Sequence, residues 1–155
     1  MEAKATQALL NELVETLKDG QKGYAEAMVD VKDADLKSTF KDLAAQRSSY
    51  LNELEYQMFK LDLKVDTNEG AKGSITGAVH RAWIDLKSAV TGHDRHSILA
   101  ECERGEDYAK KAYQTALAAQ DLPSGVKSVI EKQYQGVQQA HDQIKALRDS
   151  TADSN

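Results

Sequence analysis

The sequence has one cysteine, one proline and few aromatic residues, and it lacks any long apolar run. The single cysteine, Cys102, excludes an internal disulfide and any paired-cysteine metal or redox motif. No stretch approaches the ~20 apolar residues that a membrane-spanning helix needs. Acidic residues interrupt the first apolar positions, so no signal peptide is predicted. We therefore expect a soluble, cytoplasmic protein without a membrane partner.

A concentration of charge of one sign is also missing. The net charge is −5, with acidic and basic residues interspersed along the chain. Proteins that bind nucleic acids usually gather basic residues into a stripe that neutralises phosphates. We therefore expect no nucleic-acid partner. A homo-oligomer is compatible with the sequence, and no protein partner can be named from it.

The abundant residues are Ala, Leu, Lys, Gln, Glu and Asp, which favour long helices. Apolar residues recur at helical spacing, and no segment shows the alternation of a strand. The pattern predicts four helices of about 26–31 residues and a shorter one of about 17. Their ranges are about 5–32, 34–65, 74–91, 94–120 and 124–149.

The helix lengths and the breaks between them predict the topology. At ~1.5 Å per residue, the four long helices would each be ~40–46 Å long, which suits a bundle. The turn at residues 32–35 is so short that its two helices must be antiparallel. The segment 66–93, with an eight-residue loop at 66–73, is long enough to return the chain along the bundle. We predict an all-α, ferritin-like four-helix bundle of two hairpins, with a crossover helix at about 74–91. It would form one domain over 1–149, followed by a disordered tail over 150–155.

Polar residues interrupt the apolar stripes at one level of this bundle. Arg47 lies on a heptad line of apolar residues, and counting from the turns places it level with Glu106. His141 falls about one turn from Glu106, with Glu103 nearby, and Tyr24 can reach the same region. One interpretation is a buried Arg47–Glu106 ion pair that forms a polar core cluster with His141 and Tyr24 or Tyr134. Such a pair fixes the register of helices.

The second interpretation is a metal centre. Ferritin-like bundles that bind two metals use Glu-x-x-His pairs from two helices, but Gln138 precedes His141 here and the second helix has no histidine. We therefore expect no cofactor. The alternative is a degenerate site for iron or another divalent metal at Glu103, Glu106 and His141, which the positive charge of Arg47 would oppose.

Three further features concern single residues or short runs. His93 and His96 could share an ion, but the sequence suggests no third ligand. Cys102 lies on an apolar stripe and is expected to be a small buried residue rather than a nucleophile. Within residues 80–83 (His-Arg-Ala-Trp), Trp83 is expected to anchor the crossover helix, with a binding pocket beside His80 as the alternative.

Several short motifs resemble a known family. They are Gly23-Tyr24-x-Glu26-Ala27, Gln46-Arg47, Glu53-Leu54, Gly77-x-x-His80-Arg81-x-Trp83-x-Asp85-Leu86-Lys87 and Glu103-Arg104-Gly105-Glu106-Asp107. Over roughly residues 6–147 the chain resembles a bacterial, mostly proteobacterial, family that is catalogued as a domain of unknown function. The resemblance implies a ferritin-like four-helix-bundle fold and no established activity. We expect a non-catalytic protein with a binding, structural or stress-associated role. A ferritin-like metal-binding protein, or a degenerate di-metal oxidase, is the alternative.

Overall fold

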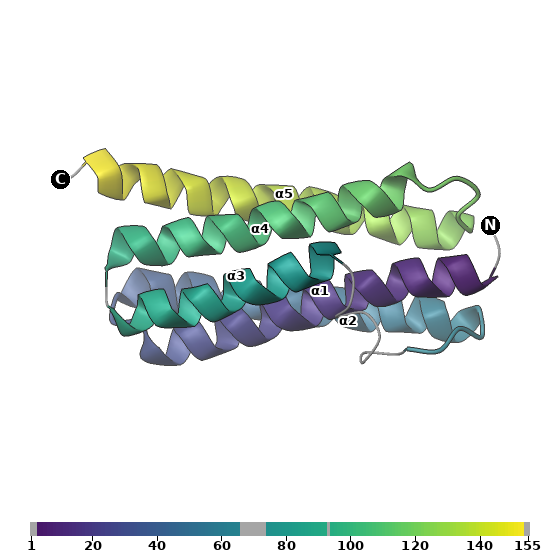
Figure 1. Cartoon of the computed structure of the whole chain (residues 1–155), viewed down its shortest axis with the longest axis horizontal. Coiled ribbons are helices and arrows are strands. Elements are labelled where there is room, and N and C mark those ends of the chain that lie inside the picture. Colours follow the sequence, from purple (N-terminus) through teal and green to yellow (C-terminus); the bar gives the residue numbers. More distant parts are fainter. Residues whose placement is uncertain (1–2, 66–73, 93, 154–155) are drawn as a thin grey trace.

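Five helices form the regular structure of residues 3–65, 74–92 and 94–153, which the computed structural model describes (Figure 1). They are α1 (Ala3–Asp30), α2 (Ala34–Lys60), α3 (Ser74–Thr91), α4 (Arg95–Ala118) and α5 (Ser124–Asp153). These ranges contain no strand. The predicted all-α helical bundle is therefore confirmed.

The helices form two hairpins that α3 connects (Figure 1). α1 pairs with α2, and α4 pairs with α5. α3 runs back along α1 and α4, so that α2 and α4 point in the same direction (Figure 1). The predicted crossover helix coincides with α3, whereas the loop expected at 66–73 lies outside the described residues.

Two helices end four or five residues away from the predicted positions, and the others end within two residues of them. α2 ends at Lys60 rather than near Val65, because Asp62 adopts a left-handed backbone conformation, with φ of 57°, and the Leu63 N–H bonds to the Met58 carbonyl. α5 continues to Asp153, into the segment expected to be a disordered tail. There the Thr151 hydroxyl lies 3.1 Å from His96 Nδ1, which attaches the end of α5 to α4.

The buried core consists of two apolar clusters with a polar layer between them. One cluster contains Phe40, Leu86 and Ile144, and the other contains Leu13, Leu54 and Ile130. Between them lie the buried charged side chains of Arg47 and Glu106. No helix among the described residues is both long and apolar enough to cross a bilayer.

Candidate functional site

Arg47 on α2 and Glu106 on α4 form a two-pronged ion pair inside the bundle. Arg47 Nη1 donates to Glu106 Oε1 at 2.8 Å, and Nη2 donates to Oε2 at 2.6 Å. The Tyr24 hydroxyl on α1 donates to the same Oε1 at 2.9 Å. The two charged residues are only 1% and 0% exposed. Glu106 therefore has both oxygens committed to protein donors, and it is not a free metal ligand.

In this layer the pKa values of Arg47, Tyr24 and Cys102 are all raised. Burial favours neutral Arg47, but the Glu106 carboxylate outweighs burial and raises the guanidinium pKa above its ordinary value. Burial, with the Glu106 charge, raises the pKa of the Tyr24 hydroxyl well above its ordinary range. The same two causes raise the pKa of the buried Cys102 thiol. Cys102 is thus a protonated core side chain, which does not suit a nucleophile.

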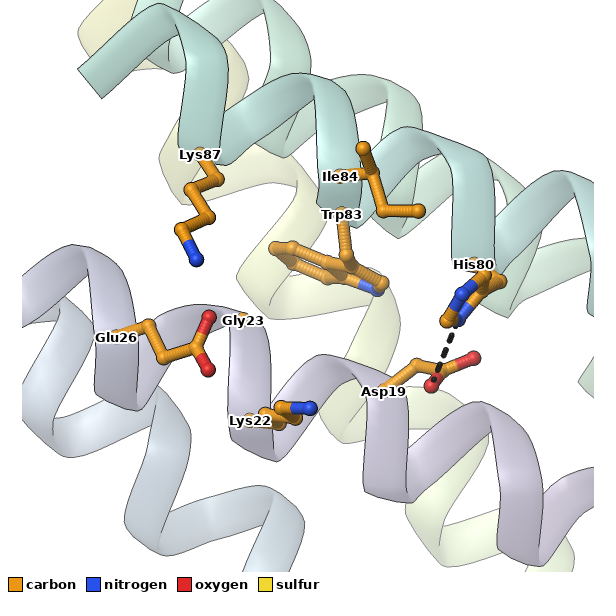
Figure 2. Close-up of a pocket in the computed structure, with 8 residues that line it drawn as sticks. All are labelled: Asp19, Lys22, Gly23, Glu26, His80, Trp83, Ile84 and Lys87. Carbon is orange, nitrogen blue, oxygen red and sulfur yellow. Dashed lines mark hydrogen bonds and ion pairs between the residues drawn. The ribbon is translucent and has the colours of Figure 1, made fainter. Parts of the chain in front are cut away.

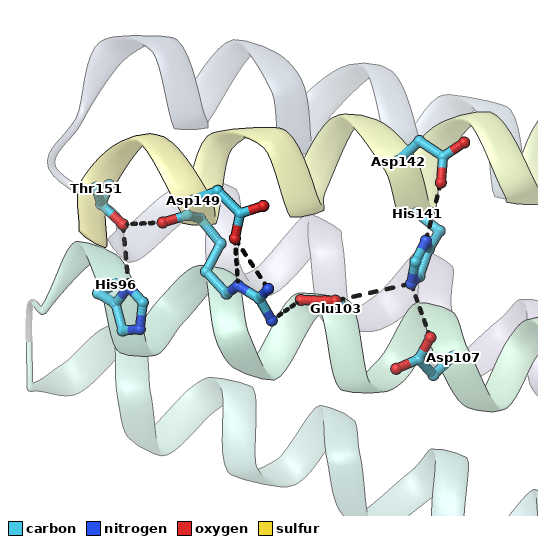
Figure 3. Close-up of polar contacts among 8 residues, drawn as sticks. His96, Glu103, Asp107, His141, Asp142, Asp149 and Thr151 are labelled. Atoms are coloured by element: carbon cyan, nitrogen blue, oxygen red, sulfur yellow. Dashed lines mark hydrogen bonds and ion pairs between the residues drawn. The ribbon is translucent and has the colours of Figure 1, made fainter. Parts of the chain in front are cut away.

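His141 does not join this layer, which corrects the predicted polar core cluster. It lies on the outer seam between α4 and α5, where Nε2 is 2.8 Å from Asp107 Oδ1 and 3.8 Å from Glu103 Oε1 (Figure 3). Consecutive residues on a helix differ by about 100° in direction. Glu106 points into the core, and Asp107 therefore points along the seam toward His141.

Glu103, Asp107 and His141 form a cluster with the donor set of a metal site. One ligand atom from each residue lies within 4.8 Å of the other two. The predicted metal alternative contained two of these residues, but it used Glu106 where the structure has Asp107. The sequence signal for Asp107 is the four-residue spacing from Glu103, which puts both carboxylates on one helix face.

Further charged side chains of α5 lie next to the cluster (Figure 3). His141 Nδ1 lies 3.2 Å from Asp142 Oδ1, and this hydrogen bond lowers the pKa of the Asp142 carboxyl. Arg148 contacts the second oxygen of Glu103 and also bonds to Asp149 at 2.9 Å. The hydrogen bond to Asp149 raises the pKa of Arg148. These contacts orient the His141 ring and the Glu103 carboxylate.

Trp83 anchors α3 on the bundle, as expected. Its indole ring lies against the backbone of Gly23 on α1 and Gly105 on α4, and it meets the Tyr24 ring edge-on at 4.7 Å between centroids. A methyl group at Gly23 would lie 2.5 Å from Trp83 Cε3, and one at Gly105 would lie 2.9 Å from Cζ2. The indole ring therefore fits into a slot between α1 and α4 that exists because positions 23 and 105 carry no side chain.

His96 and His80 are separate from these sites. His96 contacts Thr151 near the start of α4, and His93 lies outside the described residues. His80 lies on α3, where its Nδ1 is 3.5 Å from Asp19 Oδ1. An ion shared by His93 and His96, which the sequence disfavours because it suggests no third ligand, would involve a residue outside the described ones.

Comparison with known proteins identifies a family but no activity. No curated protein matches the chain. A family model described as "Domain of unknown function (DUF2383)" matches residues 5–119. The match covers α1 to α4 and stops before α5, which carries His141, whereas the resemblance was expected to run to about residue 147. Because it covers most of the chain, this protein belongs to the DUF2383 family.

Proposed function

We propose that this protein is a non-catalytic helical bundle, ferritin-like in its connectivity, that binds one divalent metal ion at Glu103, Asp107 and His141. The observation that carries the proposal is the convergence of two carboxylate oxygens and one imidazole nitrogen within 4.8 Å. Nitrogen and oxygen donors of this kind suit zinc, manganese and ferrous iron. The proposed site lies on the α4–α5 seam and not in the bundle interior.

The surroundings of His141 support this proposal. When Nδ1 carries the ring proton, it donates to Asp142, and Nε2 presents its lone pair to Asp107 and Glu103. Histidine ligands of metals usually donate their other nitrogen to a carboxylate in this way. A lone pair facing two carboxylates is repelled unless a cation lies between them. Either a second ring proton or a metal ion supplies that positive charge.

Exposure and charge also fit a bound cation. The Glu103 and His141 side chains are largely buried, whereas the Asp107 side chain is 49% exposed and gives access from solvent. Asp142 and Asp149 add negative charge around the cluster, and Arg148 balances part of it. Three protein ligands would leave positions for water on the ion.

The test is calorimetric titration of tag-free, chelator-treated protein with ZnCl2 and MnCl2, with elemental analysis of the loaded protein. We expect about one equivalent of at least one of the two metals to bind. His141→Ala and Asp107→Asn should each weaken binding by at least ~10-fold. His96→Ala is the matched control and should bind as the unchanged protein does.

Two results would reject the metal proposal. One is a lack of saturable binding by either ion. The other is binding that His141→Ala and His96→Ala alter to the same extent, because the metal would then lie elsewhere. In either case Glu103, Asp107 and His141 would be a polar cluster of the α4–α5 seam that holds no metal ion.

A further inference from the structure

A groove between α1 and α3 has no part in the metal site (Figure 2). It holds a volume of about 280 Å³. Trp83 and Gly23 lie at its base, and charged side chains from both helices surround it. Pockets that bind drug-sized ligands measure roughly 300–1,000 Å³. The groove therefore suits a smaller molecule.

The indole N–H of Trp83 is the feature that points to a ligand. Trp83 is only 6% exposed, and its N–H makes no hydrogen bond to any described residue. This N–H is not among the fully enclosed polar atoms that lack a partner, so it opens into the groove, where a bound molecule can accept its hydrogen bond. Figure 2 shows the indole nitrogen turned toward the end of the groove where Asp19 and His80 lie. Because Gly23 and Gly105 hold the ring on both sides, it cannot rotate to find a partner in the protein.

The rim of the groove carries equal numbers of positive and negative side chains. Lys22 and Lys87 are the cations, and Asp19 and Glu26 are the carboxylates. Asp19 already lies against His80, and burial raises the pKa of its carboxyl. Glu26 lies at the opposite end of the groove from His80 (Figure 2). A simple anion would be repelled by these carboxylates. A molecule that carries one positive and one negative charge can instead pair with a carboxylate and with a lysine.

We propose that this groove binds a small zwitterion of the size of a free amino acid. Its carboxylate accepts hydrogen bonds from the Trp83 indole N–H and from Lys22, and its ammonium group lies against Glu26. The ligand fills the acceptor position that no protein group occupies. This site is independent of the proposed metal centre, which is built from α4 and α5.

The single tryptophan makes the test direct, because every tryptophan signal comes from Trp83. The indole N–H cross-peak of ¹⁵N-labelled protein would be followed while free L-amino acids are added in the presence of EDTA. Acetate and methylammonium are the probes with one charge. We expect at least one amino acid to shift the cross-peak in a saturable way, and neither single-charge probe to do so.

Two variants test which residues contact the carboxylate and the ammonium group of the ligand. Lys22→Met and Glu26→Gln should each weaken amino-acid binding by at least ~10-fold. Lys111→Met, an exposed lysine on α4, is the matched control and should leave binding unchanged. The backbone cross-peaks of each variant check that the fold is retained.

Three outcomes would overturn the zwitterion proposal. The first is an indole cross-peak that no amino acid moves at concentrations up to about 10 mM. The second is an equal shift with acetate, which would indicate an anion site. The third is a shift that Lys22→Met and Glu26→Gln leave unaltered, which would place the ligand outside this groove.

Discussion

Glu106 and Asp107 are neighbours in the sequence, but they lie in opposite environments. The Glu106 side chain is fully buried and bonded to Arg47, whereas half of the Asp107 side chain is exposed next to His141. The turn of about 100° per helical residue separates the two carboxylates. One of them therefore contributes to the core, and the other is available for a ligand.

The buried pair should show strong coupling. Arg47→Ala or Glu106→Ala leaves one charge buried without its partner and should lower the free energy of unfolding by ~3–5 kcal/mol. Arg47→Met combined with Glu106→Leu should recover most of that loss, because no charge is then left buried. Urea unfolding of Arg47→Met, Glu106→Leu and their double variant measures the coupling energy, because the same substitutions then appear singly and together. Additive losses would mean that the pair does not act as a unit.

At the scale of elements, α3 depends on a contact with two other helices. Trp83 fits between Gly23 on α1 and Gly105 on α4. Through this one side chain, α3 packs against both hairpins. Glycine usually weakens a helix by about 1 kcal/mol relative to alanine. At these two positions the gain from alanine is opposed by a clash with the indole ring.

Alanine substitutions test the slot. Gly23→Ala and Gly105→Ala should each lower the free energy of unfolding by ~1–3 kcal/mol, because the indole ring or a helix must shift. Gly77→Ala is the control, because its methyl group would meet only the flexible end of Arg81, at 3.4 Å. It should be neutral or stabilising by up to ~1 kcal/mol. Urea unfolding measures all three, and similar effects at the three positions would contradict the slot.

The sequence predicted the helices well, because they depend on local patterns. It predicted the candidate site only in part, because the site depends on how the helices pack. Helical periodicity is a local signal, and it located all five helices and the crossover. Counting along the helices also placed Arg47 level with Glu106, and the structure has them in contact. The direction of His141 depends on how α4 and α5 rotate against each other, which periodicity does not specify. The slot for Trp83 needs three helices to meet, so no single segment could reveal it.

At the scale of the whole molecule, the two hairpins meet through α3, the polar layer and one end of the bundle. At that end Arg95 bonds to Asp33 at 2.6 Å and to Asp35 at 2.7 Å, joining the start of α4 to the α1–α2 turn. The hydrogen bond from Arg95 lowers the pKa of the Asp35 carboxyl. Because these side chains are partly exposed, the main stabilisation comes from the buried layers.

The stability of the whole chain should fall at alkaline pH. Tyr24 and Cys102 have ordinary pKa values of 10.0 and 9.0, and burial raises both in the folded protein. Above about pH 9 the unfolded chain therefore loses protons that the folded chain keeps. The free energy of unfolding should then decrease by up to ~1.4 kcal/mol per pH unit for each group.

Urea unfolding between about pH 8 and pH 11 measures this slope. Tyr24→Phe and Cys102→Ala should each flatten it, even though each also lowers stability at neutral pH. A slope unchanged in the double variant would assign the effect to other groups.

The slot for Trp83 also has a kinetic consequence. Gly23 belongs to the first hairpin and Gly105 to the second, so neither hairpin contains the slot by itself. Helices form within microseconds, whereas contacts between distant segments form later because closing the chain costs entropy. The indole ring can therefore be enclosed only after α1, α3 and α4 have met. Burial of this one side chain, followed by tryptophan fluorescence, would therefore report when the two halves of the chain come together.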